Sequence, residues 1–148
     1  NGGGQIVAAG DLDALASLAP EGARVRALQV AGAFHTHFMS PAVEAFSDFA
    51  STITTSDPAV GVLSNRDGQV LNSGSEILSR IVSQVANPVR WDLCMSTMQA
   101  VGVTKALEVA PAGTLVGLLK RAAEGIESYA FKSSDDLAAA SQFVSSKG

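Results

Sequence analysis

The chain has few charged residues, few aromatic residues, one cysteine and no long apolar run. Charged residues make up 16% of its 148 residues, against about 25% in an ordinary soluble domain. One thiol, Cys94, allows neither an internal disulfide nor a multi-cysteine metal site, so a reducing cytoplasm is the expected location. No apolar run approaches the roughly 20 residues of a membrane-spanning helix, so no membrane is expected.

The charge that is present has the wrong sign for nucleic acid. Ten basic residues stand against fourteen acidic ones, which gives a net charge of -4 and a pI near 5.0. A surface that neutralises phosphates needs the opposite excess, so no nucleic-acid partner is expected.

Apolar residues, in contrast, are abundant. They form 47% of the chain, and the mean hydropathy is +0.24. A chain of this length has room for one domain, and its high ratio of surface to volume should demand more polar residues. Since the sequence also begins with Asn1 instead of Met, we expect a piece of a larger protein.

In the first half of the chain, strand and helix patterns alternate. Residues 5–10 read as a short buried strand, a helix should follow the Asp11 cap, and residues 25–30 alternate like a half-buried strand. Ser40 and Pro41 predict the start of a helix that runs to about residue 54. Its expected inner face consists of Ala42, Phe46, Phe49, Ala50 and Ile53.

The second half continues the alternation. Ser73 begins a predicted helix that ends near Val85, and a second helix after Pro88 should bury Trp91, Met95 and Met98. The other expected elements are a strand at 60–64, a strand at 105–109, a helix through 115–121, a strand at 128–131 and a helix from 135. This order predicts an α/β fold with a mainly parallel sheet.

His35 and His37 lie in an irregular stretch between elements, where catalytic groups are often presented. An H-x-H pair could bind a metal, but no third ligand stands in the same loop, so no metal is expected. From the residues alone, a hydrogen-bonded structural histidine and a catalytic one both stay open.

Ala110–Thr114 is the other candidate, because a strand, small residues and a helix start follow one another there. A helix N-terminus could bind an anion, although the single glycine and the missing P-loop lysine favour simple packing of strand on helix. The chain contains no G-x-S-x-G, so it has no nucleophile elbow of its own.

Four segments in order resemble a known family. They are the pattern N-x-x-x-Q-x-V-x-A-G from Asn1, GAFHTHFMSPA from Gly32, QVANPVRW from Gln84 and LEVAPAGTLVGLLKR from Leu107. Together they resemble the second half of bacterial malonyl-CoA:acyl carrier protein transacylases and the acyltransferase domains of polyketide and fatty acid synthases. Ala110 and Ala112 depart from the pattern, because glycines are usual at these positions.

The resemblance implies a fold and a set of site residues. It implies the C-terminal part of an α/β hydrolase-like large subdomain over 31–148, after the end of a small ferredoxin-like subdomain over 1–30. His35 stands at the position of the general base, and Gln84 at the position whose main-chain carbonyl orients that histidine. Phe34 matches the variant associated with malonyl over methylmalonyl substrates, since a bulky ring leaves less room for an α-methyl group.

The implied reaction is a step of fatty acid biosynthesis and lipid metabolism. A malonyl group moves from malonyl-CoA to the phosphopantetheine thiol of acyl carrier protein by a Ser/His covalent mechanism, and no cofactor is needed. In the family, the serine, the arginine for the malonyl carboxylate and the oxyanion-hole donors precede the segment that corresponds to Asn1. The chain is therefore expected to be an acyltransferase fragment, incomplete and inactive alone, whose partner is the missing N-terminal half.

Two other functions remain alternatives. One is a non-catalytic α/β binding module with structural histidines. The other is half of a serine hydrolase or thioesterase, which would release the acyl group to water instead of to a carrier thiol.

Overall fold

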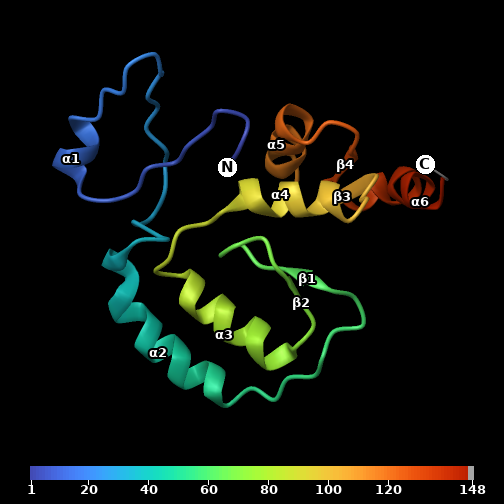
Figure 1. Ribbon diagram of the computed structural model, residues 1–148, viewed down its shortest axis with the longest axis horizontal. Helices are drawn as coiled ribbons and strands as arrows, with labels where there is room; N and C mark the ends of the chain where they lie inside the picture. The colour runs from blue at the N-terminus through green and yellow to red at the C-terminus, as the bar shows by residue number, and fades with distance from the viewer. Residues whose placement is uncertain (147–148) are drawn as a thin grey trace. The chain divides into compact units, whose positions relative to one another are not determined.

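The computed structural model describes residues 1–146 and divides the chain into two compact units (Figure 1). Residues 6–66 and 70–89 form the first, here called the helical unit. Residues 1–5, 67–69 and 90 onward form the second, here called the βαβ unit. Among the described residues, no helix is both long and apolar enough to cross a membrane.

The helical unit is built around two helices that pack against each other, α2 and α3. Its elements are α1 (Leu12–Ala16), η1 (His37–Met39), α2 (Ser40–Ser51), β1 (Val62–Leu63), β2 (Val70–Leu71) and α3 (Gly74–Gln84). β1 and β2 pair antiparallel, with Val62 opposite Leu71.

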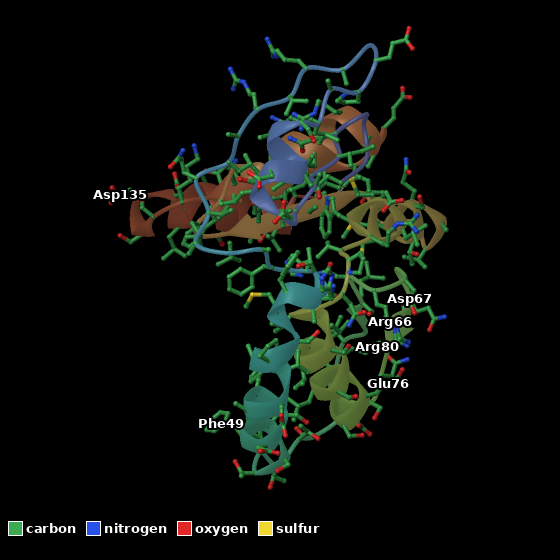
Figure 2. The ribbon with its side chains drawn as sticks, turned by 90° about the vertical axis from the view of Figure 1, so that its left-hand side faces the viewer. Phe49, Arg66, Asp67, Glu76, Arg80 and Asp135 are labelled. Carbon is green, nitrogen blue, oxygen red and sulfur yellow. The ribbon has the colours of Figure 1, made fainter. Side chains whose placement is uncertain are left out.

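Side-chain caps place the starts of α1 and α3, as the sequence predicts, whereas at α2 the cap position is Met39, with Ser40 already inside the helix and no side-chain cap bond. The Asp11 carboxylate accepts from the N–H groups of Asp13 and Ala14, both at 3.0 Å, at the start of α1. At α3, the Ser73 hydroxyl accepts from the Glu76 N–H at 3.4 Å. The Glu76 carboxylate pairs with Arg80 one turn later, at 2.7 Å, on the same side of α3 (Figure 2).

The two strands predicted at 5–10 and 25–30 are wrong. Both segments are irregular apart from a single bridge between Gly2 and Gln5, and Ile6 is 89% exposed. An apolar run becomes a strand only when a neighbouring strand satisfies its N–H and C=O groups, and sequence pattern does not reveal that neighbour. Of the strand, helix and strand predicted for residues 5–30, only the helix is therefore formed.

The inner face predicted for α2 is also partly wrong. Ala50 is buried, but Phe49 is 65% exposed and Ile53 is 45% exposed. Phe49 projects from α2 on the side away from α3 (Figure 2). Successive helix positions are about 100° apart, so Phe49 points in a different direction from Ala50, and Ile53 lies beyond Ser51, the last residue of α2.

The βαβ unit contains a parallel strand pair and its crossover helix. Its elements are α4 (Trp91–Ala100), β3 (Lys105–Val109), α5 (Thr114–Ala122), β4 (Glu127–Phe131), η2 (Ser134–Asp136) and α6 (Leu137–Ser145). β3 and β4 pair from Lys105 opposite Glu127 to Val109 opposite Phe131. The mainly parallel sheet that the sequence predicts is not formed in the described part of the chain, which has two separate two-stranded sheets, the parallel β3–β4 pair and the antiparallel β1–β2 pair.

The core of the βαβ unit lies where α4, α5 and the start of β4 meet. Its buried members are Met95, Leu118, Leu119, Ala123 and Ile126. Trp91 and Met98 pack against them, which confirms the stripe predicted for α4.

Candidate functional site

His35 is held by the end of a helix 49 residues away along the chain. Its Nδ1 lies 2.8 Å from the main-chain oxygen of Gln84, and its main-chain N–H donates to the oxygen of Val85 at 2.9 Å. Gln84 is the last residue of α3, and Val85 follows it. The final carbonyls of a helix have no partner within that helix, so they are available to accept from His35.

The backbone of His35 is unusual. Its φ is 66°, in the left-handed region, and it is the non-glycine residue with positive φ in the described chain. Such a conformation costs on the order of 1–3 kcal/mol and persists where surrounding contacts impose it. The two hydrogen bonds to successive carbonyls of α3 are contacts of that kind.

The contact with Gln84 determines which nitrogen of the neutral His35 ring carries the proton. A carbonyl oxygen only accepts hydrogen bonds, so Nδ1 must carry the proton for this contact to be a bond. Nε2 of the neutral imidazole then has a free lone pair. A ring in this state can accept a proton at Nε2 while Gln84 holds it from the opposite side.

Thr36 shapes the loop that presents His35. Its hydroxyl donates to the Ala33 oxygen at 2.7 Å and accepts from the Phe38 N–H at 3.3 Å. The second bond caps η1, which leads directly into α2. The loop is thus fixed on both sides of His35.

His35 lines an open hollow of about 510 Å³ in the helical unit. The other lining residues are Ala9, Gly10, Asp11, Thr36, His37, Phe38, Ala86 and Pro88. The walls are mainly small or apolar, with the two imidazoles as the nitrogen bases. A neutral ring at such a surface can exchange protons with a group that enters from solvent.

His37 lies differently from His35. Its ring packs on that of Phe38, with centroids 4.2 Å apart. Within residues 1–146, no group of three histidine, cysteine, aspartate or glutamate side chains is arranged to hold a metal ion.

Phe34 is 48% exposed and lies against Gly32, and it is not among the residues that line the hollow.

The start of α5, the second candidate, is filled by a side chain. The Glu108 carboxylate accepts from the N–H groups of Gly113, Leu115 and Val116 at 2.8, 2.9 and 2.9 Å. Burial alone would raise the pKa of Glu108, but the hydrogen bonds from these N–H groups outweigh it and lower the pKa. An external anion would have to displace this carboxylate, so the packing interpretation of Ala110–Thr114 fits the structure and an anion site does not.

The contact predicted between the His35 ring and the Gln84 carbonyl is present, and the catalytic roles of His35, Gln84 and Phe34 stay predictions. The sequence pattern did not indicate that Val85, Thr36 or Glu108 holds a site in place. Thr36 carries a recognisable cap signal, two residues before Phe38. The Val85 contact had no local signal, because it depends on the left-handed backbone of His35.

The chain is similar in sequence to one group of enzymes. No protein-family model matches it. A malonyl CoA-acyl carrier protein transacylase of Mycobacterium tuberculosis is 51% identical over 140 residues, which cover 93% of this chain and 46% of that protein. The chain thus spans about half the length of the curated relatives that it matches.

Solved structures give the same result. A crystal structure of MCAT from Mycobacterium tuberculosis matches with a TM-score of 0.78 and 49% identity over 84% of this chain and 41% of that one. A structure of a type II PKS acyl-carrier protein in complex with its malonyl-transacylase matches with a TM-score of 0.70 and 29% identity, over 76% of this chain and 37% of the matched chain. The mixed α/β character of the chain agrees with these structures.

Proposed function

Because this chain belongs to the malonyl-CoA:acyl carrier protein transacylase family, we propose that it supplies the histidine half of such an enzyme's active site. The proposed reaction transfers a malonyl group from malonyl-CoA to the phosphopantetheine thiol of acyl carrier protein, in fatty acid biosynthesis. The observation that carries the proposal is the 2.8 Å contact between His35 Nδ1 and the Gln84 oxygen. It leaves Nε2 of an exposed, oriented ring as the proton acceptor.

In the first half-reaction, His35 Nε2 takes the hydroxyl proton of a serine as the serine oxygen attacks the thioester carbonyl. The tetrahedral intermediate collapses, its C–S bond breaks, and the proton on Nε2 passes to the departing CoA sulfur. In the second half, Nε2 takes the proton of the carrier thiol, the sulfur attacks the malonyl ester, and the serine oxygen leaves with that proton. The imidazole ends unchanged, so the reaction requires no resident metal or cofactor.

Gln84 serves this cycle through its main-chain oxygen. The imidazolium formed in each half-reaction carries a proton on both nitrogens, and Nδ1–H keeps donating to Gln84 throughout. A neutral carbonyl here performs the orienting task that a carboxylate performs in Ser-His-Asp triads.

We propose that the serine belongs to the half of the family protein that this chain does not match. The chain alone is then inactive, and its partner in catalysis is that other half. On the same basis, residues 31–148 complete an α/β hydrolase-like large subdomain, and residues 1–30 end a small ferredoxin-like one. Phe34, beside His35, restricts the acyl group to malonyl by leaving less room for an α-methyl branch.

A chimera tests the proposal. Residues 1–148 replace the matching half of the Mycobacterium tuberculosis relative, and malonylation of acyl carrier protein is followed by mass spectrometry. His35→Ala should lower the transfer rate by about 10²–10⁴, the usual contribution of a general base. His37→Ala, in the same loop, is the matched control and should stay near the unmodified rate.

Two results would contradict the proposal. A transfer rate for His35→Ala as close to the unmodified rate as that of His37→Ala would leave both histidines structural. Release of free malonate with no malonylated carrier would instead indicate a hydrolase.

A further inference from the structure

Gln84 interacts through its side chain as well as through its main chain. Its carboxamide Nε2 donates to the main-chain oxygens of Asn87 and Pro88, at 2.8 and 2.9 Å. The side chain therefore ties the turn after α3 back to the last residue of that helix. Both N–H groups of the amide are used in this way.

A second side chain closes the same turn. The Asn87 amide donates to the Ser83 oxygen at 2.6 Å, and the Asn87 main-chain N–H approaches the Gln84 oxygen at 3.3 Å. The Gln84 oxygen is thus shared between the turn and the His35 ring. Its direction depends on how residues 85–88 leave the helix.

Holding His35 requires more than the presence of a carbonyl, since every residue has one. The ring and the N–H of His35 bind two successive carbonyls, of Gln84 and Val85, and both must point to the same place. At the end of a helix these groups have no intrahelical partner to fix their direction. The bonds from the Gln84 amide supply that constraint from the far side of the turn.

We propose that the Gln84 carboxamide is a positioning residue for His35. By bridging the Asn87 and Pro88 oxygens, it holds the two carbonyls that keep the His35 ring in its Nδ1–H form, with Nε2 open. The expected effect on catalysis rests on the proposed function of His35, whereas the expected effect on the ring does not. The effect on the ring is measurable in the 148-residue chain without any activity.

Two variants remove the donors. Gln84→Met has a side chain of similar length with no N–H group. Gln84→Glu has the same shape, but it turns a carboxylate oxygen, which only accepts, toward the Asn87 and Pro88 oxygens. Gln142→Met, on the exposed surface of α6, is the matched control. Nitrogen NMR of labelled histidine reports the tautomer at about pH 9, above the range in which imidazole titrates. A His37→Gln variant assigns the two rings.

The unmodified chain and the control should show His35 in the Nδ1–H tautomer, and both Gln84 variants should show a mixture of the two tautomers. Dispersed main-chain amide spectra establish that the helical unit is folded. Wild-type tautomers in both folded variants would overturn the proposal. Unfolding of both would also overturn it, because Gln84 would then serve the fold and not the ring.

The chimera separates this proposal from the proposed function. Gln84→Met should lower kcat by about 10- to 100-fold, since a small misplacement of a catalytic group has effects of this size, with little change in the KM of malonyl-CoA. A changed tautomer with an unchanged kcat would support positioning and contradict the role of His35 as base. An unchanged tautomer with a reduced kcat would overturn positioning alone.

Discussion

Replacing Glu108 by glutamine should destabilise the βαβ unit. The carboxylate of Glu108 accepts from three N–H groups at the start of α5, those of Gly113, Leu115 and Val116. These are among the N–H groups that a helix start leaves without a partner. The glutamine amide keeps one acceptor oxygen and turns an NH₂ group toward the donors.

The size of the effect follows from those contacts. Val116 is buried, so water reaches its N–H poorly once the carboxylate oxygen is gone. Loss of a helix cap costs about 1–2 kcal/mol, and an unsatisfied buried donor costs about 1–3 kcal/mol. Because the remaining amide oxygen retains part of the interaction, we expect the free energy of unfolding to fall by about 2 kcal/mol at pH 7.

The pH dependence has a definite sign. The pKa of Glu108 in the folded chain lies below its usual value of 4.5, so the carboxylate contributes stability fully above that value. The contribution is lost as pH falls through the lower folded-state pKa. The difference in stability between wild type and Glu108→Gln should therefore be complete at pH 7 and shrink below about pH 4.5.

Urea unfolding followed by circular dichroism, repeated at steps from about pH 7 to about pH 3, measures this difference. Glu127→Gln is the control, since Glu127 is an exposed carboxylate on the neighbouring strand β4, and its effect should stay within about 0.5 kcal/mol. Equal stability of the two variants at pH 7, or a deficit for Glu108→Gln that persists unchanged in acid, would refute the reasoning.

Two further predictions concern the thiol and the acyl specificity. Cys94 is fully buried, and burial first, then the charges of Asp67 and Asp92, raise the pKa of its thiol. In the folded chain it should react with a thiol reagent at least about 100-fold more slowly than Ser96→Cys on the exposed side of α4 made in a Cys94→Ala background, and comparable rates would contradict this. In the chimera, Phe34→Ala should raise kcat/KM for methylmalonyl-CoA relative to malonyl-CoA by about 10-fold or more, whereas Phe49→Ala should not. An unchanged ratio would exclude Phe34 as a specificity residue.

Local signals predicted the helices of this chain better than its strands. Asp11 and Ser73 marked helix starts from a few neighbouring residues, because a cap involves only the first turn. The strand at 105–109 was predicted with its observed bounds, since the turn-forming segment Ala110–Thr114 follows it directly. The strands expected at 5–10 and 25–30 failed because pairing partners lie outside any local window.

The His35 site was also only partly predictable from the sequence. The resemblance to a family indicated His35 and Gln84 as a pair, and the structure brings the ring and the carbonyl together. The left-handed backbone of His35 and the side-chain bonds of Gln84 were not predictable, because they arise only when the loop and the end of α3 meet. Sequence pattern identified the residues and left their orientation undetermined.

The start of α5 and the end of α3, the two candidate sites, differ in which main-chain groups the helix leaves unpaired. A helix leaves N–H groups unpaired at its start and carbonyls unpaired at its end, and other side chains satisfy them. At the start of α5, Glu108 does so with both carboxylate oxygens, which closes that end to an anion. At the end of α3, His35 does so with one ring nitrogen, and an imidazole has two. The second nitrogen is what makes this helix end, and not the other, a candidate for proton transfer.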